Sequence, residues 1–181
     1  MFNILGKKKL TIDALANIFV NSVLDAIDNG FEDVAAIINN AAEFISQPEI
    51  VADDDSKFTL IVLAANLKEV PKYFEAKKDN RLISVITEKL SKVFEIDKFQ
   101  LDKNLNDYKS YLSRVNHPSK NNIYAMSKAV FFKYELGQYQ EEYFKNLNAP
   151  NPLLLKRLDK AMEMFLFDWE RYKKDYQIID H

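Results

Sequence analysis

Three consecutive carboxylates, Asp53, Asp54 and Asp55, form the densest group of side chains in this sequence that could do chemistry. Carboxylate oxygens bind Mg²⁺ and Ca²⁺, so these residues are the candidate metal ligands. The Ca²⁺-binding loop also needs alternating acids, a glycine and a distal glutamate, which do not follow here. The D-D-x-x-D spacing of magnesium-diphosphate enzymes would need an aspartate where Lys57 stands. Neither ligand pattern is complete.

The same acids are also typical of the start of a helix. In the run from Phe58 to Leu67, only Thr59 and Asn66 are polar, which favours a helix with neighbours on several sides. Aspartate side chains accept hydrogen bonds from first-turn amides, and their charge suits the positive end of the helix dipole. We therefore interpret Asp53 to Asp55 as the capped entrance to a core helix, with the metal site as the alternative.

Residues for acid–base or nucleophilic catalysis are few. The chain has no cysteine, and its only histidines are His117, beside Pro118 in a polar segment, and the last residue, His181. Neither histidine follows a glutamate by three positions, as the E-x-x-H pattern of di-iron helical bundles requires. Three isolated glycines also cannot build a phosphate-binding loop. We expect no catalytic residue and no cofactor, which disfavours an enzyme without excluding one.

Aromatic residues are the remaining candidates, at 13% of the chain. They crowd into two regions, the first with Phe131, Phe132, Tyr134, Tyr139, Tyr143 and Phe144, the second with Phe165, Phe167, Trp169, Tyr172 and Tyr176. Helical spacing favours core packing for most of them, but tyrosine and tryptophan are also enriched at interaction hot spots. The candidates for an interface or a pocket rim are Tyr124, Tyr139, Tyr143, Trp169 and Tyr172.

The elements that must position these side chains are helices. With 181 residues, the chain is long enough for one core, and three glycines and five prolines are too few for the turns of a β-sandwich or barrel. The sequence predicts an all-α fold, a single compact bundle of about seven to nine helices spanning residues 1–181. Residues 116–122, with the sequence "NHPSKNN", are the predicted loop or hinge.

Helix boundaries follow from the apolar spacing. A first helix begins after Thr11 and ends at Asn29-Gly30, where glycine suits a left-handed C-cap, and a second runs from residue 31 toward Pro48. Asn151 and Pro152 start a long C-terminal helix. Its a/d seam consists of Leu155, Leu158, Met162, Phe165, Trp169, Tyr172 and Tyr176. This 155–176 seam pairs either within the chain or between two chains.

The N-terminal residues 1–10 are predicted to be a flexible tail. An alternative is that Phe2, Ile4 and Leu5 insert into an anionic membrane surface while Lys7 to Lys9 contact the headgroups. No apolar run is long enough for stable insertion across a membrane. The net charge of −2 and the presence of only four arginines argue against nucleic-acid binding. The absence of cysteine and of a secretory-signal pattern favours a cytoplasmic protein.

Two functional hypotheses remain. The first is a non-catalytic helical module for protein–protein interaction, whose partner is another protein or a second copy of the chain, paired through the Leu155–Tyr176 seam. The alternative is a small-molecule binding protein or cryptic enzyme with an apolar interhelical pocket for a small apolar ligand. The predicted lining of that pocket is Phe131, Tyr134, Phe165 and Trp169.

Overall fold

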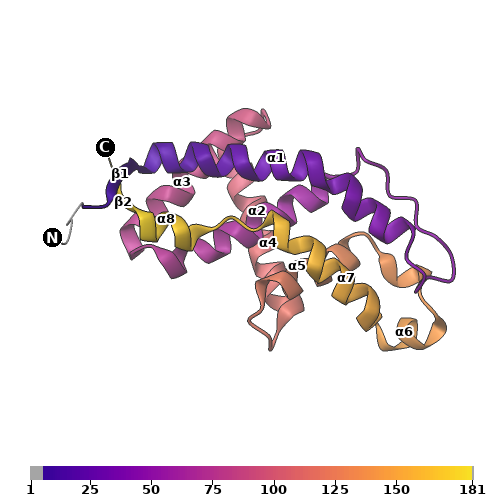
Figure 1. The fold of residues 1–181 in the computed structure, drawn as a ribbon. Helices are drawn as coiled ribbons and strands as arrows, with labels where there is room; N and C mark the ends of the chain where they lie inside the picture. Colours follow the sequence, from indigo (N-terminus) through magenta and orange to yellow (C-terminus); the bar gives the residue numbers. More distant parts are fainter. Residues whose placement is uncertain (1–5, 181) are drawn as a thin grey trace.

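Helices make up nearly all of the regular structure in residues 6–180, the part of the chain that the computed structural model describes. The elements are β1 (Lys8–Thr11), α1 (Ile12–Asn39), α2 (Ser56–Tyr73), α3 (Ala76–Val93), α4 (Lys98–Asn116), α5 (Asn122–Lys133), the 3₁₀ turn η1 (Leu136–Tyr139), α6 (Glu142–Leu147), α7 (Pro152–Met162), η2 (Glu163–Phe165), α8 (Trp169–Asp175) and β2 (Tyr176–Ile179). The chain thus has the predicted compact all-helical fold. α6 lies at one end of the molecule, and β1 and β2 lie at the other (Figure 1).

The predicted break at Asn29-Gly30 is wrong, because α1 continues through it to Asn39. Its start is as expected, with the Thr11 side chain accepting a hydrogen bond from the Ala14 amide. Gly30 has no positive φ, so it is not a left-handed cap. A Cβ atom at Gly30 would lie 2.8 Å from Cζ of Phe165, so glycine is required there for close packing. The predicted second helix from residue 31 therefore forms the last part of α1, and its predicted continuation toward Pro48 is wrong because residues 40–47 are not helical.

Helix α2 is the predicted core helix. It packs against α1, α3, α4, α5 and α8, and it buries every residue from Ile61 to Leu67. A helix with neighbours on several sides has no polar face to present to water, which explains the nearly unbroken apolar run. The one amide side chain of this run, Asn66, is fully buried and hydrogen-bonds to the C-terminal segment.

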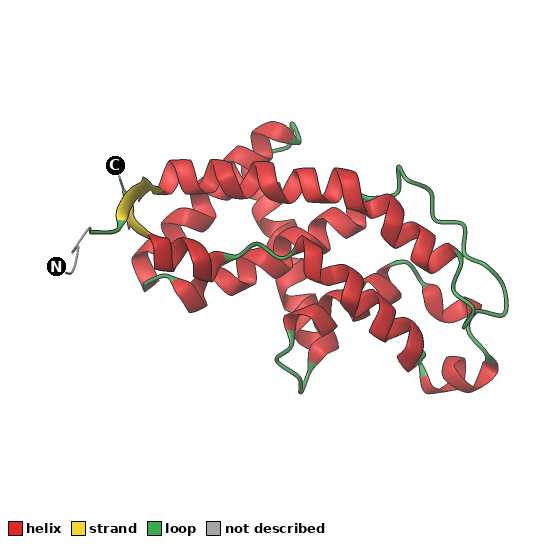
Figure 2. Ribbon diagram, viewed as in Figure 1, coloured by secondary structure: helices red, strands yellow, loops and turns green. Residues whose placement is uncertain are grey.

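The long C-terminal helix predicted after Asn151 is also wrong. The chain leaves α7 at Met162 and passes through η2 and an extended segment before α8 begins at Trp169 (Figure 2). The Asn66 side chain holds this break, because its amide donates to the Phe165 carbonyl at 2.8 Å and its oxygen accepts from the Phe167 amide at 2.7 Å. These bonds pair the main-chain groups that leave the helix.

The predicted a/d seam packs within the chain. Leu158, Met162, Phe165 and Trp169 are all at most 2% exposed in the core. The central side chains of the seam therefore contact other helices of the same chain and are not exposed for pairing with a second chain. The break at Met162 directs Phe165 and Trp169 toward α1 and α2 instead of along one helical face.

Part of the predicted N-terminal tail is a strand. β1 pairs in parallel with β2, in a register that sets Lys8 opposite Tyr176 and Thr11 opposite Ile179. Residues 1–5, the rest of the predicted tail, lie outside the described residues, as does His181. At the predicted loop of residues 116–122, residues 117–121 connect α4 to α5, and hinge motion there stays a prediction.

Candidate interaction surface

The acidic residues Asp53 to Asp55 do precede a helix, but their side chains do not cap it. Asp55 occupies the N-cap position of α2 and makes no side-chain cap bond. The hydroxyl of Tyr134 hydrogen-bonds to main-chain groups at this end of the helix. It accepts from the Phe58 amide at 3.2 Å and donates to the Asp54 carbonyl at 2.6 Å. Burial of this phenol raises the pKa of Tyr134 well above its usual value.

The metal alternative for Asp53, Asp54 and Asp55 finds no further ligands nearby. Across residues 6–180, no three side chains of His, Cys, Asp or Glu gather as the ligands of a metal ion would. The other residue considered for catalysis, His117, is exposed just after the end of α4. Of the site residues proposed from the sequence, the structure therefore brings together only aromatic ones.

Two of the aromatic candidates pack in the core or against it. Trp169 is only 2% exposed, its ring stacks on Phe19 with centroids 4.9 Å apart, and its Nε1 donates to the Asn66 carbonyl at 3.1 Å. Tyr172 is half-buried and stacks on Phe167 at 4.9 Å. The side chain of Trp169 is therefore a structural part of the core rather than of an interface or a pocket rim.

The other three candidates gather around the segment that connects α6 to α7. Tyr143 lies on α6, and Tyr139 lies on the adjoining η1, where its ring contacts Phe44 with centroids 5.9 Å apart. Tyr124 lines a shallow depression beside Ala149 and Pro150. Two of these rings are half-buried, whereas that of Tyr143 is 66% exposed. Tyr143 is thus the aromatic candidate that is most accessible to a partner.

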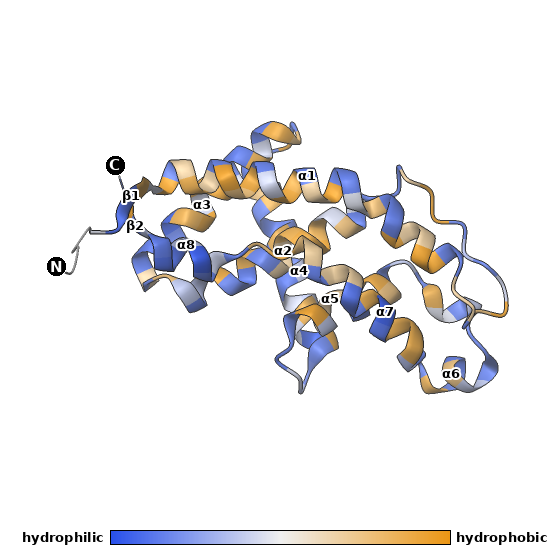
Figure 3. Ribbon diagram, in the orientation of Figure 1, coloured by the Kyte–Doolittle hydropathy of each residue, from blue (hydrophilic) through white to orange (hydrophobic). Residues whose placement is uncertain are grey.

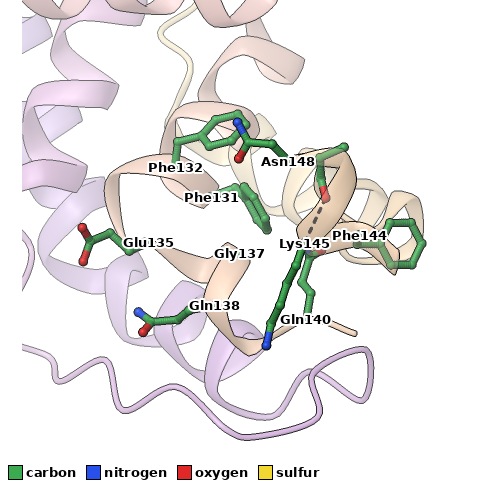
Figure 4. A pocket seen from close by; sticks show the side chains of 10 residues that line it. Phe131, Phe132, Glu135, Gly137, Gln138, Gln140, Phe144, Lys145 and Asn148 are labelled. Atoms are coloured by element: carbon green, nitrogen blue, oxygen red, sulfur yellow. Dashed lines mark hydrogen bonds between the residues drawn. The ribbon is translucent and has the colours of Figure 1, made fainter. Parts of the chain in front are cut away.

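A pocket of about 480 Å³ opens to solvent next to α6. Its lining is Phe131, Phe132, Glu135, Gly137, Gln138, Gln140, Phe144, Lys145, Asn148 and Ala149. Figure 4 shows that these side chains come from the end of α5, from η1 and from α6 and the residues after it. Aromatic walls with amide, carboxylate and amine groups at the rim can accept an apolar group and also hydrogen-bond to its polar parts.

A fully buried glutamine holds the frame of this pocket. The Gln140 amide donates to the Ala149 carbonyl at 2.9 Å, and its oxygen accepts from the Asn151 amide at 2.6 Å. Between these partners and α6, Asn148 adopts a left-handed φ of 47°, a conformation that asparagine tolerates better than most residues. The chain can therefore reverse between α6 and α7 without leaving main-chain groups unpaired.

Helix α6 exposes apolar side chains that no other element covers. None of its residues is buried, and Tyr143 and Leu147, one helical turn apart, are 66% and 57% exposed. In Figure 3 hydrophobic residues are visible along α6 at its end of the molecule. We call Tyr143, Leu147 and the adjoining pocket the α6 surface. Sequence reasoning missed Leu147, although its i, i+4 spacing from Tyr143 was the available signal.

Comparisons with known proteins do not add to this description. No family model, curated protein or solved structure matches the chain. Within residues 6–180, no helix combines the length and the apolarity needed to cross a membrane. The function must therefore be inferred from the geometry and chemistry of the chain itself.

Proposed function

We propose that this protein is a non-catalytic helical module that binds a partner protein through the α6 surface. The observation that carries the proposal is the exposure of Tyr143 and Leu147 beside an open pocket with aromatic walls. Tyrosine gives a large contact area at a small cost in conformational entropy, and its hydroxyl satisfies a polar group of the partner. An apolar side chain of the partner enters the adjoining pocket.

The surroundings of α6 extend this contact. Leu153 at the start of α7 and Ile45 in the segment after α1 are each 65% exposed. The Ile45 amide donates to the Tyr139 carbonyl at 2.8 Å, so this residue is held beside η1. Apolar residues around a central aromatic anchor are the usual arrangement of an interface core. The partner is a different protein or a second copy of this chain, and in the second case α6 makes the contact in place of the buried seam.

The alternative function is binding of a small apolar ligand in the same pocket. Its volume of about 480 Å³ falls within the range of known ligand sites, about 300–1,000 Å³. All four residues predicted to line such a pocket are buried, and of them Phe131 lies at the wall of this pocket, whereas Tyr134, Phe165 and Trp169 do not line it. Native mass spectrometry of the protein from its own cells tests this alternative, because a stoichiometric small adduct lost in a Gln140→Leu variant would support it.

Site-specific photo-crosslinking tests the protein-interaction proposal. A benzophenone amino acid replaces Tyr143 in one variant and Phe99 in a matched control, since Phe99 is 78% exposed on α4, away from α6. Irradiation in the cells that make the protein should yield a discrete crosslinked species from position 143. A dimer mass would identify the partner as a second copy. Crosslinking from position 99 alone, or from neither position, would overturn the assignment to α6.

A further inference from the structure

The end of the molecule opposite α6 is rich in lysine. Strand pairing and the packing of α2, α3 and α8 bring together nine basic residues from three parts of the sequence. They are Lys7, Lys8, Lys9, Lys72, Lys77, Lys78, Arg81, Lys173 and Lys174, which we call the basic end. The whole chain has a net charge of −2, so this end has the opposite sign to the rest.

Two adjoining depressions make the basic end a continuous surface. One, of about 350 Å³, is lined by Lys72, Tyr73, Phe74, Glu75, Lys78, Lys173, Tyr176 and Ile178. The other, of about 450 Å³, is lined by Lys77, Lys78, Arg81 and Asp180. Lys78 belongs to both, so the amines of the two depressions face a common region. Lys7 joins them, because its Nζ donates to the Lys173 carbonyl at 3.0 Å.

Acidic residues neutralise only part of this charge. Glu69 pairs with Lys72 at 2.7 Å, and Glu75 and Asp180 stand at the edges of the two depressions. Asp175 lies 3.7 Å from Arg171 on the next turn of α8. Within residues 6–180, Lys72 is the one member of the basic end that forms an ion pair. The remaining amines are thus available to an anionic partner.

We propose that the basic end docks reversibly on a bilayer that contains anionic phospholipids. Its lysines complement the negative surface of such a bilayer, whose attraction acts within about 8 Å at physiological salt. The residues that precede Gly6 are Met1, Phe2, Asn3, Ile4 and Leu5, of which four are apolar. In the sequence this segment directly precedes Gly6 and Lys7. Charge on the folded surface and an adjoining apolar segment together supply the two signals that peripheral binding needs.

A nucleic acid is the less fitting partner for the same charges. Lysine provides eight of the nine cations, with Arg81 as the exception, whereas nucleic-acid sites favour the planar, forked guanidinium of arginine. An apolar segment beside the cations also has no role on a phosphodiester backbone. The inference is independent of the proposed protein partner, since α6 lies at the other end of the molecule (Figure 1).

Vesicle sedimentation with the full chain tests this inference. Vesicles of pure phosphatidylcholine are compared with vesicles in which about a third of the lipid is phosphatidylserine, at physiological salt. The test variant is the triple substitution Lys77→Gln, Lys78→Gln and Lys173→Gln. The matched control replaces three exposed lysines elsewhere, Lys120→Gln, Lys156→Gln and Lys160→Gln.

We expect binding only to the vesicles that contain phosphatidylserine. Each lysine removed from the basic end should weaken partitioning about fivefold, so the triple variant should lose roughly a hundredfold and the control little. A second variant, Phe2→Ser with Leu5→Ser, leaves the charges in place and should also weaken binding. Equal binding to both vesicle types, or equal loss in the two triple variants, would overturn the proposal. Binding to a DNA or RNA oligonucleotide with no binding to vesicles would show that the partner of the basic end is a nucleic acid and not a bilayer.

Discussion

Two irregular segments in the C-terminal third of the chain are held by the same chemistry in different surroundings. Asn66 pairs with the carbonyl of Phe165 and the amide of Phe167, and Gln140 pairs with the carbonyl of Ala149 and the amide of Asn151. Each buried side-chain amide thus contacts an acceptor and a donor two residues apart, as a neighbouring β-strand would. The chain can leave a helix without unpaired main-chain groups in both places.

The difference lies in what each amide positions. Around Asn66 the side chains are aromatic and buried, and the break turns Phe165 and Trp169 into the core. Around Gln140 the break leaves α6 outside the core, with Tyr143 exposed. A buried side-chain amide that pairs with two main-chain groups can therefore either complete a core or leave a helix exposed as a surface. The side chains of the segment held by the amide decide between these two outcomes.

The largest effect is expected from Asn66→Leu. This change leaves the Phe165 carbonyl and the Phe167 amide buried without partners, and each such group costs about 1–3 kcal/mol, so the free energy of unfolding should fall by about 4 kcal/mol. Urea denaturation followed by circular dichroism measures it. Asn17→Leu, at an exposed position of α1, should change stability little. A loss near zero for Asn66→Leu would contradict the assigned role of this amide.

The matching substitution Gln140→Leu should cost about half as much, about 2 kcal/mol, because the Ala149 and Asn151 groups can reach water when α6 moves away. Hydrogen exchange is the sharper measurement for this variant. Exchange should accelerate in residues 140–152 and stay slow in α2. Faster exchange throughout the core would show that the two amides do not differ as proposed.

Gly30→Ala tests the close packing of Gly30 on Phe165, which results from the helix break that Asn66 holds. An alanine in place of glycine inside a helix usually stabilises by about 1 kcal/mol. Here its Cβ would meet the Phe165 ring at 2.8 Å, so we expect a loss of about 2 kcal/mol instead. Gly137→Ala is the control near the other amide, since its Cβ would lie 3.8 Å from Phe131 in ordinary contact. Thermal unfolding of both variants reveals whether the change in stability has opposite signs in the two.

The smallest effect is expected from Tyr134→Phe, which removes the hydroxyl between Asp54 and Phe58 and should cost about 1 kcal/mol near neutral pH. Burial raises the pKa of Tyr134 in the folded state above its unfolded value near 10. Its contribution is therefore complete below about pH 10 and is lost as the pH rises through the folded pKa. Unfolding free energies measured from pH 8 to 12 should fall more steeply for the wild type than for the variant. Parallel curves would contradict this assignment.

Periodicity in the sequence was enough to predict the parts of the fold whose packing is local. The stripe that starts after Thr11 and the apolar run before Leu67 both form the expected helices. The Asp97 cap, which accepts from the Gln100 amide, follows the same local rules. Elements of this kind depend on side chains three or four residues apart, so one segment contains all the necessary information.

The misplaced boundaries depend on partners that are distant in the sequence. Gly30 continues a helix because Phe165 packs against it, and the C-terminal helix breaks because of Asn66, 99 positions before the carbonyl it contacts. The candidate site shows the same limit. Of the five aromatic candidates, Tyr143 is exposed and Trp169 is buried, and spacing alone could not separate the two. Gln140 carries no sequence signal, since its partners are defined only by the fold.

The pairing of β1 with β2 sets a minimum time for completing this protein on the ribosome. Lys7 contacts Lys173, which is 166 positions later, so translation at about 5–20 residues per second needs about 8 to 30 s to supply that partner. During this interval Phe19 lacks the Trp169 ring that covers it in the finished fold. The apolar face of α1 is therefore incompletely covered in the nascent chain until the last helix docks.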